Sequence, residues 1–74
     1  MLHENIRFKR KERGFSQEDL AVRLHVVRQT VSKWENGMSV PDAEQLAALA
    51  DVLHTTVGEL LGATLEHEES RDRL

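Results

Sequence analysis

Helix start and stop signals recur along the whole 74-residue chain, and no segment alternates polar and apolar residues as a half-buried β-strand would. Polar residues that cap a helix N-terminus stand before apolar residues at helical spacing, and these caps are Ser16, Asp42 and Thr56. Glycines stand where a left-handed residue ends a helix, and these are Gly14, Gly37 and Gly62. The sequence therefore predicts an all-α fold of five short helices.

A chain of this length forms one small domain, near the size at which folding alone becomes marginal. We assign residues 1–62 to a helical domain. Residues 63–74 are acidic and weakly patterned, and we assign them to a C-terminal tail that is a candidate contact for a second copy or another protein.

The segment "VRQTVSKWENG", residues 27–37, places one Trp in an otherwise polar run. At about 100° per residue, a helix over residues 28–36 gathers five hydrogen-bonding side chains within an arc of roughly 140°. They are Arg28, Gln29, Ser32, Lys33 and Asn36. Val31 and Trp34 lie opposite, and Glu35 lies at the margin near Arg28. The polar face suits a groove lined with hydrogen-bond acceptors, although an ordinary solvated helix shows the same pattern.

Charge is distributed unevenly between the two halves of the chain. Residues 1–33 carry eight Lys or Arg and four Asp or Glu, a balance of +4, whereas residues 34–74 carry two and nine, a balance of −7. Together they give the net charge of −3. A basic face with an acidic back suits a protein that approaches a polyanion in one orientation, and chance segregation is the alternative.

The stretch "SQEDLAVRLHVVRQTVSKWENG", residues 16–37, resembles the phage-repressor and Cro-like (XRE-type) helix-turn-helix family. Two helices joined by about three residues, the second with a donor-rich face, are the arrangement that defines this motif. The later "VPDAEQLAALADVLHTTVGELL" is similar to the family's fourth and fifth helices, so the resemblance covers about Ile6 to Leu61. It implies a compact five-helix, repressor-like DNA-binding domain with the helix-turn-helix at the second and third helices.

The resemblance makes the helix over residues 28–36 the recognition helix, with its N-terminal half in the major groove. Arg28 and Gln29 are the leading base readers, because Arg can bond guanine O6 and N7 and Gln can bond adenine N6 and N7. Ser32 and Lys33, one turn further on, reach a base or a phosphate. Trp34 is expected to face the core, and base stacking by Trp34 is the rival interpretation.

Four further side chains are predicted phosphate contacts, and they are Arg10, Gln17, Thr30 and Asn36. Gln17 matches the family's backbone-clamping glutamine at the start of the second helix, where the helix terminus adds positive potential. Arg10 and Asn36 are expected at the flanks. Thr30 lies at the edge of the polar face, where it contacts a phosphate or a thymine methyl group.

The chain departs from the family pattern at its turns. His25 and His54 stand where the family usually has glycine, and a positive φ is less easily adopted by His than by Gly. Val27 stands where a Ser or Thr usually caps the recognition helix, and a missing cap typically costs about 1 kcal/mol. These departures predict a domain of modest stability.

Nothing in the sequence predicts catalysis, so we expect no enzyme activity, no cofactor and no metal. The chain has no cysteine, and its four histidines lack metal-ligand spacing. No apolar run approaches the ~18 residues of a membrane span and no secretory signal stands at the start, so we expect a cytoplasmic protein.

The predicted function is transcriptional regulation, with repression as the expected effect, by a homodimer that binds double-stranded DNA at an inverted repeat. Leu60, Leu61 and Leu65 either form the dimer contact or close the monomer's own core. Two alternatives stay open: an antitoxin-like module that grips a basic partner through its tail, and the DNA-binding part of a longer regulator.

Overall fold

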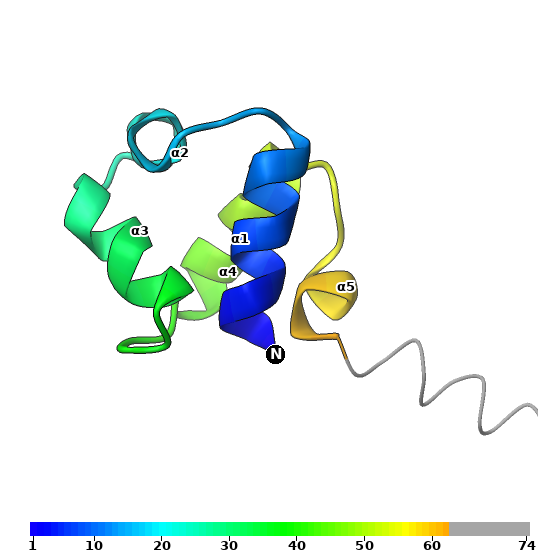
Figure 1. The fold of residues 1–74 in the computed structure, drawn as a ribbon. Helices are drawn as coiled ribbons and strands as arrows, with labels where there is room; N and C mark the ends of the chain where they lie inside the picture. Colours follow the sequence, from blue (N-terminus) through cyan, green and yellow to red (C-terminus); the bar gives the residue numbers. More distant parts are fainter. Residues whose placement is uncertain (63–74) are drawn as a thin grey trace, which may run out of the picture.

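The computed structural model of this protein describes residues 1–62, and these residues form five α-helices and no strand. The helices are α1 (Leu2–Glu12), α2 (Gln17–Leu24), α3 (Arg28–Glu35), α4 (Ala43–Val52) and α5 (Val57–Leu61), as Figure 1 shows. The predicted all-α fold is confirmed. The predicted tail, residues 63–74, lies outside the described residues, so its role as a partner contact stays a prediction.

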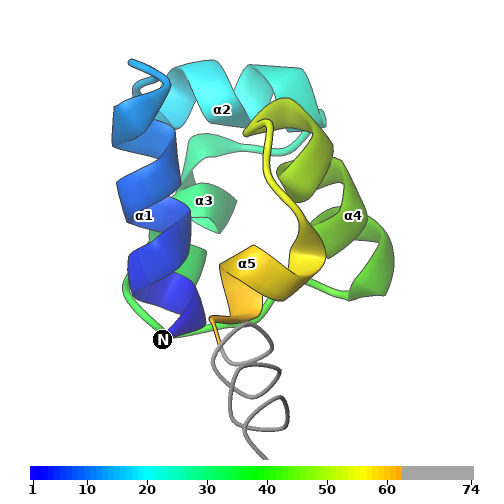
Figure 2. The same cartoon turned by 90° about the vertical axis from the view of Figure 1, so that its right-hand side faces the viewer.

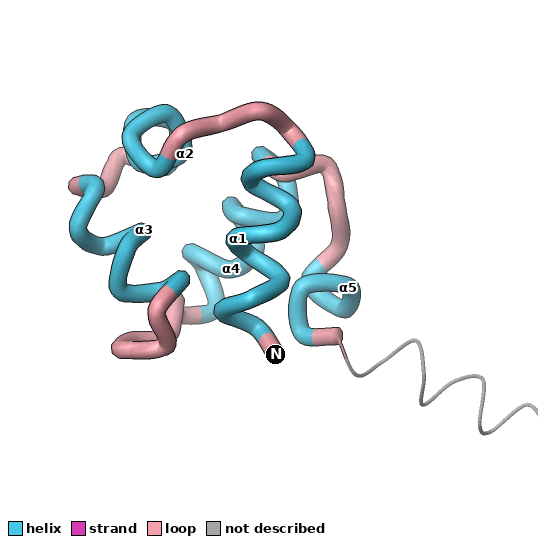
Figure 3. The backbone as a smooth tube through the Cα atoms, viewed as in Figure 1, coloured by secondary structure: helices cyan, strands magenta, loops and turns pink. Residues whose placement is uncertain are grey.

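The five helices surround one aliphatic core. In Figure 2, α1 and α4 stand on opposite sides, α2 crosses above them and α5 lies below. Helix α1 packs against α3 and α5, and α2 packs against α3 and α4. The buried apolar residues are Ile6, Leu20, Ala21, Val31, Trp34, Leu49, Ala50, Leu53 and Leu60. Every helix contributes at least one residue to this cluster, so no helix can be removed without opening the core. Figure 3 shows the same helices and the loops that join them.

Two helices begin with a complete capping box. The Ser16 hydroxyl accepts from the Asp19 backbone N–H at 2.9 Å, and the Asp19 carboxylate accepts from the Ser16 N–H at 2.9 Å. The bond from the Ser16 N–H holds the pKa of Asp19 below its ordinary value, because it favours the charged carboxylate. Asp42 and Gln45 make the equivalent pair at the start of α4, at 2.8 and 3.0 Å. The predicted helix starts at Ser16 and Asp42 are therefore confirmed.

The start of α5 differs in part from the sequence prediction. Thr56 Oγ1 accepts from the Glu59 N–H at 3.0 Å, as expected for a cap. The Glu59 carboxylate does not return this bond but accepts from the Thr55 hydroxyl, and this bond lowers the pKa of Glu59. Only half of the expected capping box is formed at the start of α5.

Both histidines that replace the usual glycines adopt the left-handed conformation. His25, which ends α2, has a φ of 61°, and His54, which follows α4, has a φ of 57°. His25 opens the turn His25–Val27 that joins α2 to α3. A side chain with a Cβ is held in a region that favours glycine, so the predicted strain at these two turns has a structural basis.

Adding a cap to α3 is expected to stabilise the domain. Val27 has an extended backbone (φ −83°, ψ 156°), makes no side-chain cap and is 63% exposed. A hydroxyl in Val27→Thr would accept an N–H of the first turn, and we expect the free energy of unfolding to rise by about 0.5–1 kcal/mol. Denaturant unfolding of Val27→Thr beside Val27→Ala, which offers no acceptor, measures the effect. Equal stabilities of the two variants would contradict it.

Candidate nucleic-acid interface

Helix α3 has a buried side and an exposed side, and it lies at the outer edge of the bundle in Figure 1. Val31 is fully buried and Trp34 is 3% exposed, so the predicted inward orientation of Trp34 is confirmed. The opposite side carries the exposed Arg28, Gln29 and Lys33, with Ser32 partly exposed among them. The helix therefore presents hydrogen-bonding groups to solvent while its apolar side fixes it to the core.

Glu35 is buried, which corrects the expectation that it lies at the margin of the polar face. It is 2% exposed, and its carboxylate accepts from Arg10 Nε at 2.6 Å and from Arg10 Nη2 at 3.2 Å. A buried carboxylate is tolerated only with such charge-paired hydrogen bonds. The pair joins the end of α3 to α1, across 25 positions of sequence.

The predicted phosphate contact of Arg10 does not agree with where the structure places this residue. Arg10 is only 8% exposed, and its third nitrogen, Nη1, donates to the Phe15 carbonyl oxygen at 2.6 Å. Each nitrogen of the guanidinium is thus engaged inside the protein. Arg10 holds α1, the α1–α2 turn and α3 together rather than facing outward.

Gln17 links this buried pair to the exposed face of α3. Its amide nitrogen donates to Glu35 Oε1 at 3.1 Å, and its amide oxygen accepts from Arg28 Nη1 at 3.3 Å. Gln17 is also the first residue of α2, where backbone N–H groups lack partners within the helix. The structure therefore brings together two predicted DNA contacts, Gln17 and Arg28.

The remaining predicted contacts lie along α3 and at its C-terminal end. Asn36 is exposed and its amide nitrogen lies 3.4 Å from Ser32 Oγ, to which it donates. Thr30 is half-buried, and its backbone N–H donates to the Val27 carbonyl at 3.0 Å. Gln17 thus flanks the exposed face at the start of α3, and Asn36 flanks it at the end.

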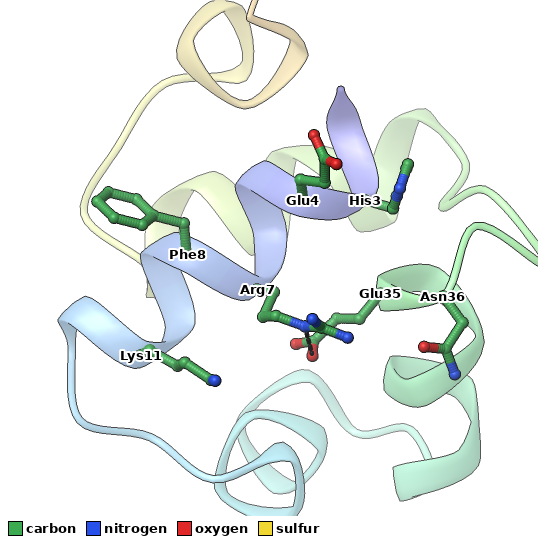
Figure 4. Close-up of a pocket in the computed structure, with 7 residues that line it drawn as sticks. All are labelled: His3, Glu4, Arg7, Phe8, Lys11, Glu35 and Asn36. Carbon is green, nitrogen blue, oxygen red and sulfur yellow. Dashed lines mark ion pairs between the residues drawn. The ribbon is translucent and has the colours of Figure 1, made fainter.

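A groove between α1 and the end of α3 was not predicted from the sequence. The groove has a volume of about 520 Å³ and is lined by His3, Glu4, Arg7, Phe8, Lys11, Glu35 and Asn36 (Figure 4). Arg7 Nε lies 3.8 Å from Glu35 Oε1, and the Arg7 side chain is 51% exposed. The i, i+4 spacing of Arg7 and Lys11 was the available signal, because it puts both on one side of a helix.

Across residues 1–62, no helix is long and apolar enough to cross a membrane. In the same residues, no group of three or more His, Cys, Asp or Glu is placed to hold a metal ion.

A short turn holding one helix across another, with an exposed donor face on the second, defines the helix-turn-helix class of proteins. The chain belongs to the helix-turn-helix family HTH_3, whose model matches residues 6–60. The resemblance to phage-repressor and XRE-type regulators is therefore confirmed.

Known proteins are similar over different parts of the chain. It is 50% identical over 46 residues to the 26 kDa repressor protein of Escherichia phage HK022, covering 62% of this chain and 20% of that protein. It is 34% identical over 76 residues to the HTH-type transcriptional activator BcrR of Enterococcus faecalis, covering 97% of this chain and 37% of the activator. The chain thus spans well under half of either relative.

The fold is also similar to a solved structure, the solution structure of the DNA-binding domain of the P22 C2 repressor. The TM-score is 0.80 and the sequence identity is 30%, and the match covers 85% of this chain and 83% of that one. The five-helix repressor-like fold is therefore confirmed.

Proposed function

We propose that this chain is a sequence-specific DNA-binding transcriptional regulator that places α3 in the major groove of its operator. The observation that carries the proposal is the exposed face of α3, on which Arg28, Gln29, Ser32 and Lys33 offer donors to base edges. The relatives named as transcriptional regulators support it, as does the DNA-binding domain of similar fold.

Base recognition in this proposal begins with Arg28 and Gln29. Arg28 bonds guanine O6 and N7, and Gln29 bonds adenine N6 and N7. The bond from Arg28 to Gln17 restrains the guanidinium before DNA arrives, so less side-chain freedom is lost on binding. Ser32 and Lys33 contact a base or a phosphate one turn further along.

Backbone contacts in this proposal come from Gln17, Thr30 and Asn36. Gln17 acts at the start of α2 and Asn36 at the end of α3, so the two hold α3 from both ends in the groove. Such contacts set the register of the protein on the duplex but do not select sequence. Arg10 is not among them, because its guanidinium is engaged by Glu35 and Phe15.

The proposal has three further parts: the protein represses by covering a promoter, it binds an inverted repeat as a homodimer, and it is cytoplasmic. The proposal includes no catalytic role, cofactor or metal. A repressor and an activator both stand among the relatives, so a promoter–reporter assay is needed to measure the sign of regulation.

The leucines proposed for the dimer contact differ in exposure. Leu60 is fully buried in the monomer core, whereas Leu61 is 44% exposed and stays the candidate dimer contact. Leu65 lies outside the described residues.

The experiment that tests the proposal is selection of bound sequences from a random duplex library. We expect an enriched inverted repeat for the wild-type chain. Arg28→Ala is expected to relax the preference at one base pair of each half-site by about 1–3 kcal/mol. Arg13→Ala is the matched control, because the Arg13 side chain contacts the Phe15 ring and His54 and is not part of the polar face of α3.

Three other outcomes have definite meanings. If Arg28→Ala kept every base preference, the assignment of the recognition face would be wrong. An enriched single half-site would contradict the homodimer while leaving DNA recognition intact, and no enrichment at low salt would contradict the proposed function.

A further inference from the structure

We infer that the groove between α1 and the end of α3 is a second contact with DNA, in which Arg7 and Lys11 bind backbone phosphates. The inference rests on the proposed function, because it names the ligand chemistry of a surface beside the same interface. Neither residue belongs to the recognition helix, so this contact adds affinity without reading sequence.

Charge around Glu35 provides the first reason. The Glu35 carboxylate is already satisfied by two bonds from Arg10 and one from Gln17. Arg7 approaches the same carboxylate at 3.8 Å, at its half-exposed position. One buried carboxylate therefore faces two guanidinium groups, which leaves one positive charge uncompensated at the mouth of the groove.

Lys11 adds to this excess of positive charge. It is an exposed lining residue of the groove, one helical turn beyond Arg7. The other acid of the groove, Glu4, is 69% exposed in its side chain, so water screens its charge. The groove thus holds a surplus of cationic donors, and this is the chemistry that binds phosphate diesters.

The position of the groove provides the second reason. Figure 4 shows Arg7 extending from α1 toward Glu35 at the end of α3, with Lys11 one turn further along α1, and Phe8 also lines the groove. Asn36 lines the groove and also flanks the exposed face of α3. Glu35 links Arg7 to Gln17 and so to Arg28. The groove is therefore continuous with the proposed DNA interface.

The salt dependence of DNA binding by the full chain tests this inference. The logarithm of affinity falls with the logarithm of salt concentration, with a slope of about 0.9 per phosphate neutralised. Lys11→Gln and Arg7→Gln are each expected to reduce this slope by about 0.9, and the double variant by about 1.8. At about 0.1 M salt, each substitution weakens binding roughly eightfold, equally for all duplex sequences.

Two matched variants separate a phosphate contact from a structural effect. Arg13→Gln removes the same charge near the Phe15 ring and is expected to keep the wild-type slope. Arg7→Lys keeps the charge and is expected to keep the slope as well, and thermal melting checks that every variant is folded. Lys11→Gln is the cleaner of the two removals, because the four ion pairs of residues 1–62 do not include Lys11.

Three results would overturn the inference. The first is a salt slope of DNA binding that stays at the wild-type value in both Lys11→Gln and Arg7→Gln while the wild-type chain binds DNA. This result would not affect the proposed function. The second is a decrease in the salt slope that is equal in Arg7→Lys and Arg7→Gln and absent in Lys11→Gln. That result would mean that Arg7 acts through its contact with Glu35 and not through a phosphate. The third is tighter DNA binding by the double variant, because the loss of two phosphate contacts can only weaken binding. If the wild-type chain bound no duplex at low salt, the proposed function would fail first.

Discussion

Replacing Glu35 by alanine is expected to lower the free energy of unfolding by about 3–5 kcal/mol, because the substitution leaves the Arg10 charge buried without its partner. Arg10 would keep one described hydrogen bond, from Nη1 to the Phe15 carbonyl oxygen, while Nε and Nη2 lose theirs. A small domain has a total stability of about 5–15 kcal/mol, so the variant would be close to unfolding at room temperature. Gln17 would lose its acceptor at the same time.

Denaturant unfolding and thermal melting measure the loss, and for a domain of this size each kcal/mol corresponds to about 4–8 °C in Tm. The matched control is the double substitution Arg10→Met with Glu35→Leu, which removes both charges and fills the space. It is expected to be much more stable than Glu35→Ala, since apolar pairs often replace buried ion pairs at little cost. A Glu35→Ala variant within about 1 kcal/mol of wild type would contradict the buried pair.

The helix boundaries were predictable because their signals are local. A cap such as Ser16 or Asp42 acts on N–H groups within three residues, so sequence spacing alone describes the contact. The positive φ of His25 was expected from the family resemblance, because the family usually has glycine at this position of the turn. The inward orientation of Trp34 could be predicted from helical periodicity, since a helix with one apolar side packs that side on the core.

The environment of Glu35 could not be predicted in this way. Helical periodicity places Glu35 between Arg28 and the apolar side, but it does not say what lies opposite, and Arg10 comes from another helix. The basic run of α1 offers several arginines and lysines, and only packing decides that Arg10 turns inward while Arg7 stays half-exposed. The site was therefore predictable where it depends on α3 alone and unpredictable where α1 and α3 meet.

Replacing Trp34 by alanine is the second change with a large expected effect, a loss of about 3–5 kcal/mol in the free energy of unfolding. Trp34 is 3% exposed and belongs to the core cluster that α3 shares with the other helices. Truncation removes most of its buried apolar surface and leaves a cavity at the base of α3. DNA binding is expected to fall with stability, because α3 would no longer be fixed to the core.

The alternative role of Trp34, stacking on a base, predicts a different result. Trp34 is the only tryptophan of the chain, so intrinsic fluorescence reports on this residue alone. We expect the emission to shift to longer wavelength on unfolding and to stay unchanged when DNA is added to the folded chain. Trp34→Phe, which keeps an aromatic ring in the core, is expected to lose less stability than Trp34→Ala and to retain DNA binding. A stable Trp34→Ala that lost DNA binding, together with fluorescence quenched by DNA, would instead place the indole ring against the bases.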